Sequence, residues 1–152
     1  MKTILRKGFK CCLSEKNKEV LIDIISLAFV SLFIYTAVSK FMTHNKFVWA
    51  LKMSPYIGDK AEVLGWIIPV TELLISGLLI FEKSRRQGLI VSLSLMTLFT
   101  AYLIYMVATI GKLPCTCGGV ISRLSWNQHI GFNLFFVGLA IAALGLFKKQ
   151  KI

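Results

Sequence analysis

The residues best suited to chemistry are two thiols, Cys115 and Cys117, in the run Pro-Cys-Thr-Cys-Gly-Gly over residues 114–119. Thiols this close in sequence can close a small disulfide ring, and strained, exposed disulfides are the ones that exchange with other thiols. The nearby cations Lys112 and Arg123 would favour the reactive thiolate form. The pattern therefore favours thiol–disulfide exchange.

Two other interpretations of these thiols stay open. A static disulfide is one, although so small a ring stabilises little, because the entropic gain grows with loop length. Metal binding is the other, and Cu(I) is the metal that soft thiolates select. His44 and His129 are candidate further ligands, although a lone histidine at a helix end is more often an interfacial residue.

A second chemical feature is Glu72, a carboxylate in the middle of the apolar run 61–81. Comparable charges at the centre of a bilayer cost about 2.5–3.5 kcal/mol on insertion scales. We therefore expect Glu72 to face the protein interior, with Lys40 as its partner about 10 Å nearer the membrane surface by helix rise. Small and polar residues of the same run recur at helical spacing and predict one inward face: Gly65, Pro69, Glu72 and Ser76.

Two roles fit the Lys40–Glu72 pair. One is a proton or quinone site beneath the exterior loops, and the other is a buried pair that only fixes the register of two helices. Three aromatic residues are candidates to line the same cavity: Tyr35, Tyr102 and Tyr105.

The elements that must position these residues follow from composition. The chain has 152 residues, of which 56% are hydrophobic and only 16% charged, against about 25% charged in soluble domains. Its mean hydropathy is +0.72. A compact fold of this size could not bury so much apolar surface. A soluble enzyme, a disordered chain and a disulfide-framework protein are therefore disfavoured.

Four long apolar runs account for this composition: 20–43, 61–81, 88–110 and 126–147. Each can cross the ~30 Å hydrocarbon layer, which takes about 20 helical residues. Only four charged residues lie inside the runs, namely Asp23, Lys40, Glu62 and Glu72. We predict an all-α membrane protein, an up-down bundle of four transmembrane helices over 20–147. Asp23 and Glu62, near helix starts, are expected to be structural.

The basic residues predict the orientation. Twelve Lys and Arg lie in the tail 1–19, the link 82–87 and the tail 148–152, against five in the loops 44–60 and 111–125. By the positive-inside rule both termini are cytoplasmic, and the loops 44–60 and 111–125, the second of which carries Cys115 and Cys117, face the periplasm or exterior. The basic tails suit contact with anionic lipid, so the expected partners include the bilayer and no nucleic acid.

The remaining cysteines, Cys11 and Cys12, lie in the basic N-terminal tail. They are expected on the reducing side of the membrane, across the bilayer from Cys115, so direct exchange between the two pairs is not expected. An inert or lipid-modified pair is the favoured interpretation.

Small residues predict where the helices pack. Glycines recur every seven residues in the last run, and a second set of small residues falls near one face of the third. Such residues let membrane helices approach closely. The two sets are Gly131, Gly138 and Gly145, and Ser94, Thr97, Ala101 and Ala108.

Several short elements together resemble a known family. In chain order they are Lys-Phe (40–41), Lys-Met-Ser-Pro (52–55), Trp-Ile-Ile-Pro-Val-Thr-Glu-Leu-Leu (66–74), Pro-Cys-Thr-Cys-Gly-Gly (114–119) and Ser-Trp-Asn-Gln-His (125–129). The chain resembles the MauE/DoxX group of redox-associated, four-helix membrane proteins from about residue 20 to residue 147.

The resemblance implies a multi-pass protein of the bacterial inner membrane. The MauE branch is named for methylamine utilisation, where it is linked to maturation of a disulfide-rich dehydrogenase subunit. By this resemblance Cys115 and Cys117 are the redox pair and Glu72 is the membrane acid of the family. Nothing in the sequence indicates methylamine itself as a substrate.

The leading hypothesis is a thiol–disulfide redox protein, or an accessory to one, that assists disulfide formation in an extracytoplasmic partner. With a single exterior cysteine pair, it would work with a separate thioredoxin-like or cysteine-containing protein, and electrons would pass to a quinone or to a partner. Whether the chain is itself a component of an oxidoreductase stays open. The alternatives are a non-catalytic membrane assembly subunit and a Cu(I)-handling protein that uses Cys115, Cys117 and His129.

Overall fold

The computed structural model describes residues 15–110 and 126–150. It consists of α1 (Glu15–Met42), α2 (His44–Lys52), the 3-10 turn η1 (Gly58–Lys60), α3 (Ala61–Ile80), α4 (Arg85–Ile110) and α5 (Trp126–Gln150). No strand occurs within these two ranges. Four helices are long and apolar enough to span a membrane: Lys16–Met42, Gly58–Ile80, Arg85–Thr109 and Gln128–Phe147. The predicted all-α fold with four membrane helices is confirmed, and the side of the membrane on which the termini lie stays a prediction.

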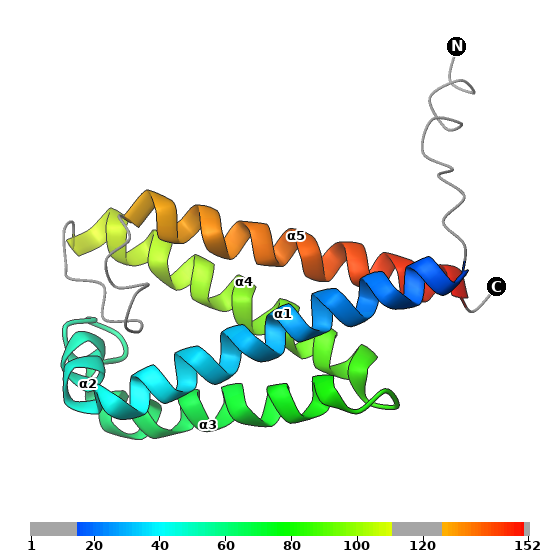
Figure 1. Cartoon of the computed structure of the whole chain (residues 1–152). Coiled ribbons are helices and arrows are strands. Elements are labelled where there is room, and N and C mark those ends of the chain that lie inside the picture. The colour runs from blue at the N-terminus through cyan, green and yellow to red at the C-terminus, as the bar shows by residue number, and fades with distance from the viewer. Residues whose placement is uncertain (1–14, 111–125, 151–152) are drawn as a thin grey trace, which may run out of the picture.

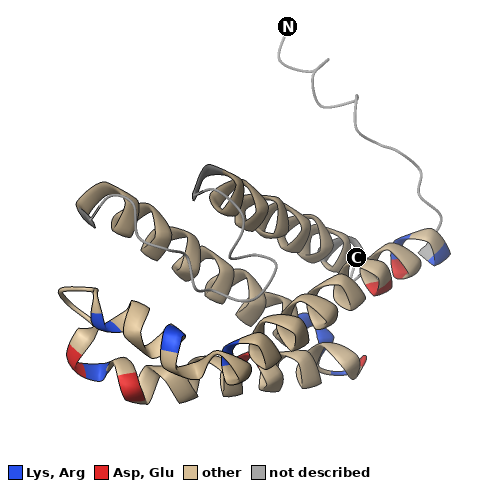
Figure 2. Cartoon of the chain, turned by 60° about the vertical axis from the view of Figure 1, so that its left-hand side comes forward, with Lys and Arg blue, Asp and Glu red and all other residues tan. Residues whose placement is uncertain are grey.

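The four long helices form two pairs, α1 with α3 and α4 with α5 (Figure 1). The pairs converge where α1 begins and α5 ends, and they diverge toward the end that carries α2. Figure 2 shows acidic and basic residues gathered at the start of α1 and around α2, while α4 and α5 are uncharged along most of their length. The bundle therefore has a narrow end and a wide end.

The main core lies toward the narrow end. Its members come from all four long helices, namely Ile25, Phe29, Val30, Phe33, Ile75, Leu79, Leu89, Met96, Phe136, Ala140 and Ala143. The rings of Phe29 and Phe136 meet edge-on at 5.1 Å, which joins α1 to α5. An ion pair between Asp23 and Arg85 links α1 to the start of α4. This end holds the two helix pairs together.

Helix α2 occupies part of the segment that we expected to be a loop over 44–60. It follows α1 after a single residue, and its buried residues Phe47, Val48 and Leu51 lie on one side. This side packs against α3, where a Cβ on Gly65 would lie only 2.6 Å from Val48 Cγ2. A short amphipathic helix thus closes onto α3 because Gly65 leaves room for it.

The expectation that the small-residue stripes pack the helices within this chain is wrong. Gly131, Gly138 and Gly145 on α5 are exposed, and no other helix of the described ranges reaches within 4 Å of their Cβ positions. Ser94, Thr97, Ala101 and Ala108 on α4 are exposed as well. On α5 the buried positions are instead those of Phe136, Ala140 and Ala143. Because lipid is as apolar as a helix neighbour, small residues alone do not identify the face that packs.

Candidate functional site

The centre of the candidate site is an ion pair between α1 and α3. Lys40 Nζ donates a hydrogen bond to Glu72 Oε1, and only 5% and 1% of the two side chains are exposed. Lys40 lies in the last turn of α1, where a cation complements the helix dipole. Glu72 lies on the predicted inward face of α3, and all four residues of that face are buried. The structure thus brings Lys40 and Glu72 together across the two helices.

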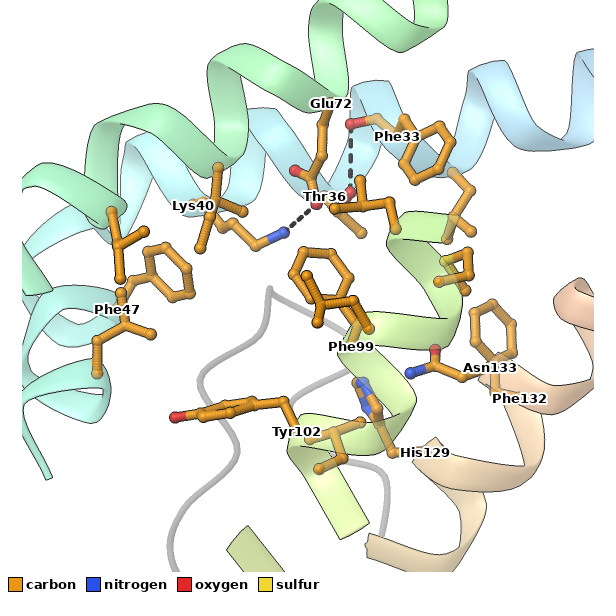
Figure 3. Close-up of a pocket in the computed structure, with 18 of the residues that line it drawn as sticks. Phe33, Thr36, Lys40, Phe47, Glu72, Phe99, Tyr102, His129, Phe132 and Asn133 are labelled. Atoms are coloured by element: carbon orange, nitrogen blue, oxygen red, sulfur yellow. Dashed lines mark hydrogen bonds and ion pairs between the residues drawn. The ribbon is translucent and has the colours of Figure 1, made fainter. Parts of the chain in front are cut away.

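Aromatic rings and a hydroxyl surround this pair. The Lys40 ammonium lies 5.7 Å from the ring centroid of Phe47 on α2 and 5.5 Å from that of Phe99 on α4, within the range of a cation–π contact. The Thr36 hydroxyl, beside Glu72 in Figure 3, donates to the carbonyl of Phe33 at 3.2 Å. Helices α2, α3 and α4 thus each place a side chain beside the Lys40 ammonium, and the side chains of α2 and α4 are aromatic rings.

One oxygen of the Glu72 carboxylate takes no part in the ion pair. Glu72 Oε2 is buried and has no hydrogen-bond partner among the residues that the structure describes. A buried acceptor without a partner costs about 1–3 kcal/mol, and more when it is charged. Such an atom is a candidate contact for a ligand or a proton.

The pair forms part of the wall of a cavity of about 280 Å³. All five α-helices contribute to its lining, which is mostly leucine, isoleucine and phenylalanine. The polar side chains in the lining are Thr36, Lys40, Glu72, Tyr102, His129 and Asn133. An apolar pocket with a few convergent polar groups is typical of sites that bind small molecules.

The wall across the cavity from the ion pair is formed by His129 and Asn133 of α5 (Figure 3). Both side chains are buried, with 6% exposed in each case. Sequence reasoning singled out His129 only as a metal ligand and missed Asn133. The signal was available, since two polar residues four apart share one face of an otherwise apolar helix.

The other residues singled out from the sequence have mixed outcomes. Tyr102 lines the cavity, whereas Tyr35 and Tyr105 are not among its lining residues; Tyr35 is 40% exposed and Tyr105 contacts Tyr56. His44 contacts Trp66 with ring centroids 4.4 Å apart and the rings tilted by 38°, outside the cavity lining. Of the three candidate tyrosines, Tyr102 therefore belongs to the cavity lining and the other two do not.

The two acids interpreted as structural are paired with bases. Asp23 pairs with Arg85, and Glu62 pairs with Lys52 at 2.9 Å on the surface. In the described ranges no three His, Cys, Asp or Glu side chains are grouped as metal ligands. The thiols Cys115 and Cys117, and Cys11 and Cys12, lie outside the described residues.

Chain connectivity still relates the cysteine loop to the site. The segment that carries Cys115 and Cys117 joins the end of α4 to the start of α5. The cavity is lined by Leu103, in the second half of α4, and by His129, in the first turn of α5. The loop is thus attached to the two helices at the end of the bundle where the cavity lies.

Comparison with known proteins identifies the family. The family model described as methylamine utilisation protein MauE matches residues 18–147, which is most of the chain and nearly all of the four membrane helices. No curated protein and no solved structure matches the chain. The MauE part of the resemblance noted from the sequence is confirmed, whereas its DoxX part stays a prediction. The chain belongs to the MauE family of membrane proteins.

Proposed function

We propose that this protein is a thiol–disulfide redox protein of the bacterial inner membrane, or an accessory to one, that assists disulfide formation in an extracytoplasmic partner. The observation that carries the proposal is the buried Lys40–Glu72 ion pair in the wall of an apolar cavity. The cavity lies at the end of the bundle to which the Cys115–Cys117 loop is attached.

The ion pair supports a function because it is an expensive way to join two helices. Burying two charges costs several kcal/mol each, and a well-packed apolar pair of similar volume is often as stable or more stable. Fixing the helix register would also not require a cavity beside the pair. Charged residues inside a membrane mark sites of ligand binding or proton movement more often than packing contacts.

The proposed chemistry takes place at the thiols. A thiolate of the partner attacks the Cys115–Cys117 disulfide and forms a mixed disulfide, and one thiolate of the loop leaves. The second thiol of the partner then attacks the mixed disulfide. The partner becomes oxidised, and Cys115 and Cys117 become a dithiol. Two electrons and two protons must then pass from this dithiol to an acceptor, which is a quinone or a partner such as a thioredoxin-like protein.

The experiment is to label thiols in intact cells with an impermeant thiol-reactive mass tag, before and after mild reduction. We expect Cys115 and Cys117 to be labelled from outside and to shift between oxidised and reduced forms with respiration. The double variant Cys115→Ser/Cys117→Ser should leave exterior partner thiols more reduced, whereas the matched control Cys11→Ser/Cys12→Ser should not. A permanently oxidised loop, or partner thiols unaffected by the first variant, would contradict the proposal.

A non-catalytic assembly role is the second candidate, and the open face of α5 favours it. Gly131, Gly138 and Gly145 are exposed, and within the described part of the chain no atom beyond their own helix backbone lies within 4 Å of their Cβ positions. Another membrane helix can therefore approach closely there. This role predicts that Gly138→Leu dissociates a complex seen by native gel electrophoresis while Cys115→Ser/Cys117→Ser leaves it intact. An intact complex in Gly138→Leu would count against it.

A further inference from the structure

We infer that the cavity beside Lys40 and Glu72 binds the head group of a membrane quinone. This inference deepens the proposed function by giving the quinone a binding site in this chain, and it rests on that function only for what the quinone does, not for whether it binds. Three features support the inference. One lining residue, Leu98, is exposed on the membrane-facing surface. The Lys40–Glu72 pair has no net charge and keeps N–H groups of Lys40 for a ligand, and a second polar wall lies opposite.

The cavity reaches the surface that faces the membrane. Leu98, near the middle of α4, lines the cavity and is 65% exposed. Because Leu98 borders both the cavity and this surface, we expect a ligand dissolved in the bilayer to enter beside it, with its tail left among the lipid chains.

The ion pair selects the charge of the ligand. Because Glu72 already neutralises Lys40, an anionic head group such as a phosphate would add an uncompensated charge to an apolar cavity, which is costly. An ammonium has three N–H donors, of which one goes to Glu72. A neutral carbonyl oxygen can accept a hydrogen bond from another. The wall thus suits an uncharged carbonyl compound better than a lipid phosphate.

The rest of the lining suits a flat ring with two carbonyl groups. Phe99 contributes an aromatic ring next to the ammonium, against which a planar head can stack. Across the cavity, His129 and Asn133 place polar groups on the opposite wall (Figure 3). A quinone has carbonyls on opposite sides of its ring, which matches two polar walls with apolar residues between them. The volume of about 280 Å³ suits a head group with the tail outside.

In the proposed function, the bound quinone would oxidise a dithiol to a disulfide. The dithiol loses two electrons and two protons, the quinone gains both and becomes a quinol, and no further reactant is needed.

The test is binding of decylubiquinone, a short-tailed quinone, to the full-length protein in lipid nanodiscs, followed by quenching of protein fluorescence. A photoreactive azido-quinone then maps the site by mass spectrometry. We expect saturable binding and labels on the lining segments of α4 and α5. The double variant Lys40→Met/Glu72→Leu removes the donor without leaving an unpaired buried charge, and its Kd should rise about 10-fold or more.

The chain offers a matched control. Lys52 and Glu62 form an exposed ion pair that likewise joins two helices, α2 and α3, so Lys52→Met/Glu62→Leu should leave the Kd unchanged. If the first double variant does not fold, Ile68→Phe reduces the space in the cavity without touching the ion pair and should also weaken binding. An unchanged Kd in the folded cavity variant, or labels outside the lining residues, would overturn the inference.

The two proposals fail in different ways. Cys115→Ser/Cys117→Ser should bind decylubiquinone as the unmodified chain does. If quinone binds but partner thiols never respond to this variant, the proposed function fails and the quinone site stands. If partner thiols respond but no quinone binds, the quinone site fails and the proposed function stands.

Discussion

The sharpest prediction concerns the stability of the Lys40–Glu72 pair. Replacing Lys40 by Met leaves the Glu72 carboxylate, whose side chain is only 1% exposed, without its partner. Breaking a buried pair in this way costs about 3–5 kcal/mol. Replacing both residues, in Lys40→Met/Glu72→Leu, removes the uncompensated charge and should be neutral or stabilising by about 1–4 kcal/mol. The double variant should therefore be more stable than the single variant.

The assay is a double-mutant cycle on the free energy of unfolding, measured in mixed micelles with increasing denaturing detergent. The cycle isolates the coupling between the two residues. The same cycle on the exposed pair Lys52 and Glu62, with 51% and 77% of their side chains exposed, should give a much smaller coupling, because water screens it. Added salt should weaken the exposed pair further and leave the buried pair unchanged.

Two outcomes would refute this reasoning. If Lys40→Met cost less than about 1 kcal/mol, the pair would behave like a solvated surface pair, which is incompatible with a place in the wall of an apolar cavity. If the double variant were as unstable as the single one, the pair would be stabilising in itself, and its presence would need no function to explain it.

Three further predictions follow from the packing. Gly65→Val should push α2 away from α3, because a Cβ at Gly65 lies 2.6 Å from Val48 Cγ2, and hydrogen exchange should then show less protection over residues 44–52. Gly77→Val is the matched control, because no described residue beyond its own helix backbone has an atom within 4 Å of the Gly77 Cβ position. Equal protection in both variants would contradict the prediction. Gly88→Val should cost about 1–3 kcal/mol by overpacking, since Leu79 atoms lie 3.0–3.1 Å from its Cβ position; a detergent unfolding midpoint equal to that of Gly77→Val would disprove it. Gly77→Ala should raise that midpoint, because alanine favours a helix by about 1 kcal/mol over glycine, and a lowered midpoint would mean that this position is packed.

The sequence was sufficient to predict the four membrane helices and the side of the site that Lys40 and Glu72 form. A helix that crosses a bilayer needs about 20 apolar residues, and the separation of charged from apolar residues in this chain is nearly complete. Glu72 and Lys40 could be found because charged residues stand out in apolar runs. The inward face of α3 could be found because its small and polar residues recur at helical spacing.

Only the tertiary structure decided the rest of the site. Helix α2 is short and depends on contact with α3 at Gly65, so its nine residues looked like part of a loop. Asn133 joins the site because α5 diverges from α1 at the wide end of the bundle. The small-residue stripes on α4 and α5 are exposed, whereas the sequence had predicted that they pack against other helices. A membrane helix is apolar on nearly every side, and its pattern therefore fixes that it spans the membrane but not which face meets lipid and which meets protein.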